Sequence, residues 1–167
     1  MQMMFLLDGV FNFNMINYIK VRFLTMKKVL FICYGNICRS VSAEYIMKDL
    51  AKKNGVDLYV SSAATSREEI GNDIYPPAKR KLKEKGIPFS IHYARQATMS
   101  DYLSYDYLIC MDENNIRNLN RMFNNDPDHK IYKLLSRDVS DPWYTNDFET
   151  AYNDIFEGCK AWLEKLS

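Results

Sequence analysis

The chain has 167 residues, 47% of them hydrophobic and 14% aromatic, which predicts one folded domain rather than a disordered polypeptide. Its 22 basic and 21 acidic residues give a formal net charge of +1, so charge favours neither nucleic acid nor an anionic membrane as a partner. The four cysteines lack the spacing of a zinc site, and a chain with this core and no evident secretory signal needs no disulfides. We therefore expect a cytoplasmic protein with free thiols and with no metal or cofactor.

The first 25 residues differ from the rest of the chain, because they are apolar and rich in asparagine. Their longest apolar run, residues 3–7, is interrupted by Asp8 and Gly9 and is far shorter than the roughly 20 residues that span a bilayer. The segment also lacks the basic start and small-residue cleavage site of a secretory signal. We expect residues 1–25 to be a disordered extension, or translation to begin at Met26, with one domain over 26–167.

From Lys27 onward, strand and helix patterns alternate. Residues 27–33 form a continuous apolar run after two lysines, which is typical of a strand buried on both faces of a parallel sheet. Ser40 is the expected N-cap of a helix that ends near Asn54-Gly55. The remaining pattern predicts strands at 58–60, 105–111 and 130–135, an extended piece at 89–93, helices at 76–85, 113–123 and 148–166, and loops at 61–72 and 137–146.

This alternation predicts an α/β fold: one three-layer α/β/α domain around a roughly four-stranded parallel sheet. In such folds ligands bind at the carboxyl ends of the strands. Cys33, the pair Met111-Asp112 and the loop after Leu135 all follow predicted strands. We therefore expect these three segments to surround one crevice.

The loop after the first strand has the features of a phosphate-binding site. Backbone N–H groups between a strand and a helix N-terminus can point inward as an anion-binding nest, and the helix dipole adds positive charge there. Arg39 offers a planar fork for two phosphate oxygens, and its charge favours the thiolate of Cys33, which can attack phosphorus. Ser40 lies where its hydroxyl can donate to that sulfur. The loop reads Cys33-Tyr34-Gly35-Asn36-Ile37-Cys38-Arg39-Ser40.

A leaving oxygen needs a proton, and Asp141 is the best candidate for the acid. Pro142 holds the residue before it in an extended conformation. Trp143 and Tyr144 can partly shield the Asp141 carboxyl from water. Asp-Pro also begins many ordinary turns, so the assignment depends on its pairing with the cysteine loop.

These two motifs resemble those of the low-molecular-weight protein tyrosine phosphatases, and the resemblance runs from about Lys27 to the C-terminus. It implies a single α/β/α domain that hydrolyses phosphotyrosine through a cysteinyl-phosphate, without a cofactor. The partner would be a phosphotyrosine-containing protein, and the enzyme a monomer or weak homo-oligomer. It implies Cys33 as nucleophile, Arg39 as phosphate clamp and Asp141 as general acid and then base.

The resemblance also implies roles for neighbouring residues. Ser40 would stabilise the thiolate, Asn36 would hold the loop in shape and Ser62 would hydrogen-bond Asn36. Cys38 would be able to form a reversible disulfide with Cys33. The predicted phosphate- and ring-binding residues are Tyr34, Gly35, Asn36, Ile37, Cys38, Trp143 and Tyr144.

Three positions depart from the family pattern. Val41 replaces a usual proline, Trp143 a usual tyrosine, and Glu68 stands where an aromatic is frequent, which makes one rim of the slot acidic. Two related activities compete with the main interpretation. An arsenate reductase of this fold needs two further cysteines close together, whereas Cys110 and Cys159 are far apart in sequence. A protein-arginine phosphatase typically carries threonine where this chain has Ile37.

Overall fold

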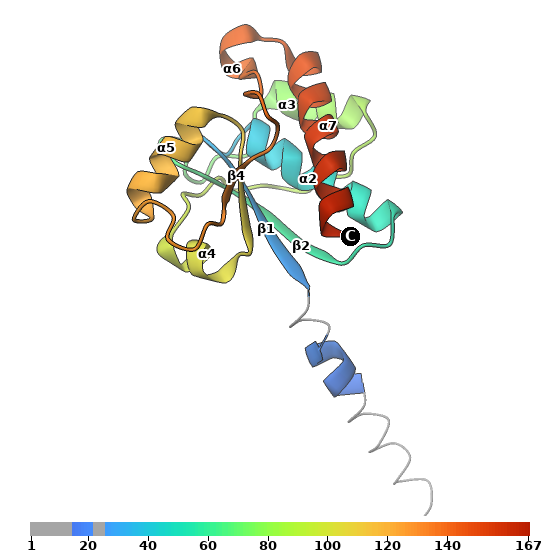
Figure 1. The fold of residues 1–167 in the computed structure, drawn as a ribbon. Helices are drawn as coiled ribbons and strands as arrows, with labels where there is room; N and C mark the ends of the chain where they lie inside the picture. The colour runs from blue at the N-terminus through green and yellow to red at the C-terminus, as the bar shows by residue number, and fades with distance from the viewer. Residues whose placement is uncertain (1–14, 22–25) are drawn as a thin grey trace, which may run out of the picture.

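A four-stranded parallel sheet forms the centre of the molecule (Figure 1). The computed structural model describes residues 15–21 and 26–167, of which 15–21 form a short exposed helix. The expected N-terminal extension falls largely on residues 1–14 and 22–25, which lie outside the described residues. The strands pair in the order β2-β1-β3-β4, and their bounds are β1 (Lys27–Cys33), β2 (Leu58–Ala64), β3 (Tyr107–Cys110) and β4 (Ile131–Lys133).

Helices cover both faces of the sheet, as the three-layer prediction requires. Val29 and Phe31 of β1 lie in one core cluster, while Leu30 and Ile32 between them lie in the other, and all four side chains are fully buried. The first cluster packs under α2 (Arg39–Lys53), α3 (Pro76–Glu84) and α7 (Phe148–Leu166); the second packs under α4 (Met99–Ser104) and α5 (Glu113–Met122). The alternation of side chains along a strand explains why the run 29–32 is apolar without interruption.

The structure differs from the predicted elements at several places. Strand β2 continues through Ala64, because its small and polar residues still pair with Phe31 to Cys33 of β1. Helix α4 was not expected and is defined by a capping box between Thr98 and Asp101. The predicted loop at 137–146 contains α6 (Pro142–Thr145), and the piece at 89–93 forms no strand.

The prediction that Ser40 caps α2 is wrong. Cys38 occupies the N-cap position and no side chain caps the helix there, while Ser40 lies inside the first turn. The Ser40 hydroxyl is instead directed to the sulfur of Cys33. The free N–H groups of this helix end therefore remain available to an anion.

Parallel pairing brings the ends of three strands to one edge. Cys33 is the last residue of β1, Asp112 caps α5 directly after β3, and Asp141 caps α6 after β4. The register places Ile32 beside Cys110 and Cys110 beside Lys133, so these segments start from adjacent strands. The fold thus assembles one site from residues about a hundred positions apart.

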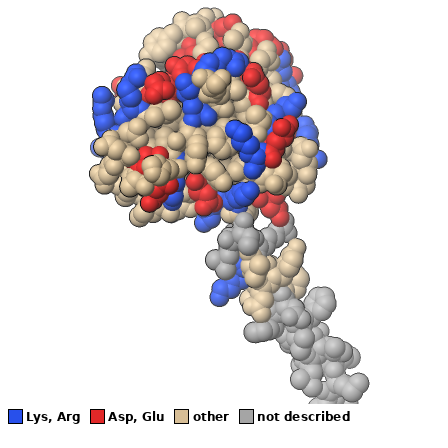
Figure 2. Space-filling view, viewed as in Figure 1, with Lys and Arg blue, Asp and Glu red and all other residues tan. Residues whose placement is uncertain are grey.

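Basic and acidic side chains are interspersed on the face shown in Figure 2, in keeping with the near-neutral composition. Within residues 15–21 and 26–167, no helix has the length and apolar character needed to cross a membrane.

Candidate active site

The sulfur of Cys33 lies at the bottom of the loop and is held by two polar groups. Ser40 Oγ is 3.0 Å from Cys33 Sγ, and the backbone N–H of Asn36 donates to the same sulfur at 3.2 Å. Both groups lie within hydrogen-bond distance of the sulfur and hold it in one position. Cys33 itself is only 3% exposed.

Asn36 braces the loop from behind. Its backbone is left-handed, with φ of 59°, and its side chain is fully buried. The amide nitrogen donates to Ser40 Oγ at 3.0 Å and to Ser62 Oγ at 2.9 Å, while the amide oxygen accepts from the Arg95 N–H. Asn36 and Ser40 therefore support the loop and lie outside the pocket lining, although Asn36 was predicted among the phosphate-binding residues.

Gly35 has little room for a side chain. Within the loop from Cys33 to Ser40, Asn36 has the left-handed backbone and Gly35 does not. A Cβ atom at Gly35 would come within 3.2 Å of Glu69 Cγ, closer than most side-chain contacts allow. The absence of a side chain lets the loop and the segment after β2 approach each other.

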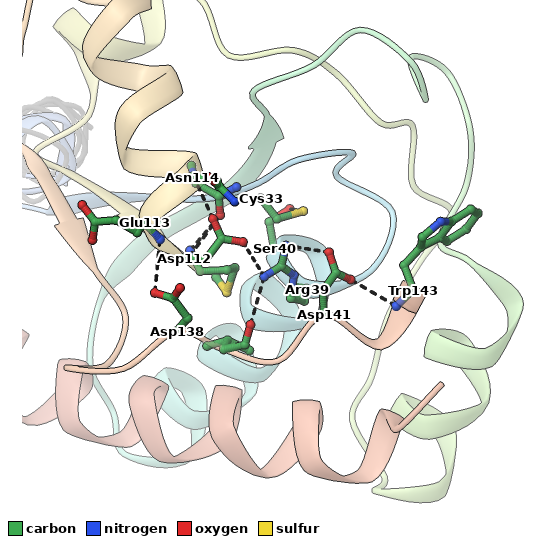
Figure 3. Close-up of polar contacts among 12 residues, drawn as sticks. Cys33, Arg39, Ser40, Asp112, Glu113, Asn114, Asp138, Asp141 and Trp143 are labelled. Atoms are coloured by element: carbon green, nitrogen blue, oxygen red, sulfur yellow. Dashed lines mark hydrogen bonds and ion pairs between the residues drawn. The ribbon is translucent and has the colours of Figure 1, made fainter. Parts of the chain in front are cut away.

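Arg39 is buried among acceptors, as Figure 3 shows. Its guanidinium donates to Asp112 Oδ2 at 2.8 Å, to the carbonyl of Val139 at 3.0 Å and to Asp141 Oδ2 at 2.8 Å. Burial alone lowers the pKa of Arg39, but the charges of Cys33, Asp141 and Asp112 outweigh it and raise the pKa above its ordinary value. The side chain thus carries a fixed positive charge beside the sulfur-bearing loop.

Asp141 faces the loop from the segment after β4. Its Oδ1 accepts from the Trp143 N–H at 3.1 Å as the cap of α6, and Pro142 occupies the first helical position. This leaves Oδ2 for Arg39. The Trp143 ring packs 5.1 Å from that of Tyr75, which steadies the rim next to Asp141.

A pocket of about 110 Å³ joins these groups. Most of the predicted site residues line it, whereas Ser62 lies behind the loop with Asn36 and Ser40. Glu68 and Glu69, from the segment after β2, complete one side. The lining residues are Cys33, Tyr34, Gly35, Ile37, Cys38, Arg39, Glu68, Glu69, Asp141, Trp143 and Tyr144.

The second cysteine of the loop differs chemically from the first. All four cysteines are free and buried. Burial raises the pKa of the Cys38 thiol, and the nearby charges of Cys33 and Asp141 raise it further. Cys38 therefore stays protonated near neutral pH.

Several contributing residues had no role in the sequence prediction. The sequence pattern predicts for Asp112 only its place after a strand. Its hydrogen-bond distance to Arg39 is nevertheless the same as that of Asp141, 2.8 Å. Its signal was an acid that directly follows a buried run and stands three residues before Asn115, its partner in a capping box. His92 contacts the Asn36 carbonyl at 2.8 Å and Glu44 accepts from Ser62 at 2.5 Å, contacts that no local pattern indicates.

Comparison with known proteins shows the family to which the chain is similar. The family described as low molecular weight phosphotyrosine protein phosphatase matches residues 28–167. The human protein of that description is 45% identical over 154 residues, covering 83% of this chain and 95% of its own length. A low molecular weight protein tyrosine phosphatase from Streptococcus pyogenes superposes with a TM-score of 0.80 at 42% identity, covering 85% of this chain and 94% of its own.

A third match bears on the alternatives weighed above. The crystal structure of a Drosophila arginine phosphatase superposes with a TM-score of 0.76 at 31% identity, covering 83% of this chain and 96% of its own. The fold therefore does not separate the two substrate classes. On the extent of the family match and the identity to its human relative, this chain belongs to the low molecular weight phosphotyrosine protein phosphatase family.

Proposed function

We propose that this protein hydrolyses phosphotyrosine in protein substrates through a cysteinyl-phosphate intermediate. One observation carries the proposal: Cys33 and Asp141, which come from distant parts of the chain, line the same pocket, and Arg39 bonds to Asp141. A nucleophile, an anion clamp and a proton donor in one pocket are the groups that phosphate-ester cleavage requires.

In the first step the Cys33 thiolate attacks phosphorus and the bond from phosphorus to the phenolic oxygen breaks. The leaving phenolate takes the proton of Asp141. Arg39 and the N–H groups at the start of α2 hold the phosphoryl oxygens, because negative charge accumulates there in the transition state. To bind the phosphoryl group, Arg39 gives up its hydrogen bond to Asp141, because the phosphoryl oxygens and the carboxylate bind the same guanidinium nitrogens.

In the second step water hydrolyses the cysteinyl-phosphate. Asp141, now ionised, removes a proton from the water, and inorganic phosphate leaves. Ser40 donates to the sulfur as the thiolate is released, which is supported by its 3.0 Å distance from Cys33 Sγ. The proton count closes over the cycle, because the proton that Asp141 gives to the phenolate is replaced from water.

The lining of the pocket favours an aryl phosphate. Trp143 and Tyr144 are exposed on one side and Tyr34 on another, which provides flat walls for a phenyl ring. Ile37 occupies the position at which an arginine phosphatase typically carries threonine. Its apolar side chain lines the pocket and suits a ring better than a guanidinium.

An arsenate reductase activity has less support. Cys110 and Cys159 are both fully buried and belong to different core clusters, so they lie on opposite faces of the sheet. A thiol relay needs cysteines that can meet on a mobile segment.

The proposal also includes a cytoplasmic monomer or weak homo-oligomer whose catalytic domain comprises residues 26–167.

The test is steady-state hydrolysis of para-nitrophenyl phosphate, a phosphotyrosine peptide and a phosphoarginine peptide. We expect the wild type to cleave the first two, and Cys33→Ser to lose turnover. Cys110→Ser makes the same substitution at a cysteine of the core and is the matched control. This variant should retain activity once its folding is verified. Absence of turnover by the wild type contradicts the proposal, and faster cleavage of phosphoarginine contradicts the substrate assignment.

A further inference from the structure

The mouth of the catalytic pocket is negatively charged apart from its phosphate clamp. Glu68 and Glu69 both line it, and in the part of the chain that the structure describes Arg39 is the one basic residue of the lining. Arg39 is 3% exposed and lies against two carboxylates. The part of a substrate that extends beyond the phosphoryl group therefore meets the carboxylates of Glu68 and Glu69 in the pocket lining.

Glu68 is fixed with respect to the nucleophile. The Tyr34 hydroxyl donates to Glu68 Oε1 at 2.6 Å. Beyond the paired strands, the Thr65 N–H donates to the Cys33 carbonyl at 2.9 Å and the Ser66 N–H to the Tyr34 carbonyl at 3.0 Å. These main-chain bonds tie the segment that carries Glu68 to the catalytic loop, so the carboxylate keeps its place beside the entering ring.

The Glu68 carboxylate retains free acceptor capacity. A carboxylate has about four lone-pair sites, and the Tyr34 hydroxyl occupies one of them. The hydrogen bond to Glu68 raises the pKa of Tyr34, so the Tyr34 hydroxyl remains a donor at neutral pH. Since Glu68 is exposed, a cation arriving with the substrate can reach it without displacing Tyr34.

We infer that Glu68, held by Tyr34 at the pocket mouth and assisted by Glu69, selects phosphotyrosines that have a lysine or arginine within about two residues. An extended peptide advances roughly 3.3–3.6 Å per residue, so such neighbours lie within reach of the rim while the ring fills the pocket. The dianionic phosphate is taken by Arg39 and the loop. This inference rests on the proposed phosphotyrosine hydrolysis and adds the sequence context of the substrate.

The test compares three phosphotyrosine peptides that differ only in whether the flanking residues are lysine, alanine or glutamate. For the wild type we expect kcat/KM for the lysine peptide to exceed that for the glutamate peptide about five- to twenty-fold, since each exposed charge pair contributes modestly. Glu68→Gln should reduce that ratio about two- to five-fold, and about 0.5 M NaCl should reduce it as well. Glu164→Gln, which changes an exposed carboxylate of α7 outside the pocket lining, is the control and should keep the wild-type ratio.

The ratio of two substrates is the readout because any general loss of activity in a variant cancels from it. Equal cleavage of the three peptides by the wild type would overturn the inference, and so would an unchanged ratio in Glu68→Gln. Turnover of para-nitrophenyl phosphate is measured in parallel. If the wild type cleaves neither this compound nor any peptide, the proposed function fails as a whole, whereas turnover without charge preference refutes the substrate selection alone.

Discussion

Asp112 gives the sharpest test of how the site is built, because its carboxylate joins the Arg39 guanidinium to the start of α5. Its Oδ2 accepts from Arg39 at 2.8 Å, while its Oδ1 caps α5 by accepting from the Asn115 N–H at 2.8 Å. Asparagine is as good an N-cap as aspartate. Asp112→Asn can keep the cap through its one amide oxygen, but it then turns an NH2 donor toward Arg39 and removes one of the two carboxylates that orient the guanidinium.

The expected magnitude follows from the burial of the pair. A hydrogen bond to a charged partner contributes about 1.5–3 kcal/mol, and no neutral acceptor replaces it, so the substitution should lower the free energy of unfolding by about 1.5–3 kcal/mol. If Arg39 loses orientation to the same extent, kcat/KM for para-nitrophenyl phosphate falls about 10- to 150-fold. Because Arg39 is only 3% exposed, solvent screening weakens its interaction with Asp112 little.

Urea unfolding and steady-state kinetics measure the two effects. The matched control is Asp154→Asn, which also removes a carboxylate from an arginine but at the surface, where Arg137 is 51% exposed. We expect that control to change stability by less than about 1 kcal/mol and to leave kcat/KM unchanged. Wild-type kcat/KM in Asp112→Asn would refute the claim that Asp112 positions the clamp.

Three further predictions concern the acid, pH and packing. Asp141→Asn should slow cleavage of phenyl phosphate much more than that of para-nitrophenyl phosphate, whose leaving group needs no proton; equal losses would contradict Asp141 as the acid. Hydrogen bonds from Lys81 and Lys85 lower the pKa of Glu149 to about 2. Glu149 therefore stabilises the α3–α7 contact fully above its pKa in the unfolded chain, roughly 4.3, and this stabilisation is lost as pH falls toward 2. The Tm difference between wild type and Glu149→Gln should accordingly shrink as pH falls from 6 to 3, and a pH-independent difference would refute this. Gly158→Ala would place a Cβ 2.4 Å from Leu134 Cγ, so we expect a loss of about 1–3 kcal/mol in urea unfolding, and wild-type stability would contradict it.

The sequence patterns predicted the three-layer fold because its central strand is buried on both faces and leaves an unmistakable apolar run. They predicted the bounds of β1 and α7 without error. The pattern predicts strand β2 only as far as Val60, because the serine and alanine residues after it carry no apolar signal. Their strand conformation depends on pairing with β1. Short α4 and α6 depend on caps and on tertiary contacts, which local periodicity does not reveal.

The site was predicted unevenly for a related physical reason. The loop from Cys33 to Ser40 is contiguous, so its residue types are visible together, and Asp141 carries a proline after it. Asp112, His92 and Glu44 act through contacts between segments 18 to 73 positions apart in sequence. Ser40 illustrates the limit well, since the serine before a helix predicted a cap and the structure directs its hydroxyl to the sulfur.

The central claim is that phosphate passes through Cys33. The test uses Asp141→Ala, which slows the second step. This variant is mixed with para-nitrophenyl phosphate and quenched with acid within the first turnover, so that the trapped intermediate can be detected by peptide mass spectrometry. We predict one added phosphoryl group on the peptide that contains Cys33, and none when Cys33→Ser is introduced into the same variant. A phosphoryl group on any other residue, or rapid turnover with no covalent adduct, would contradict the mechanism.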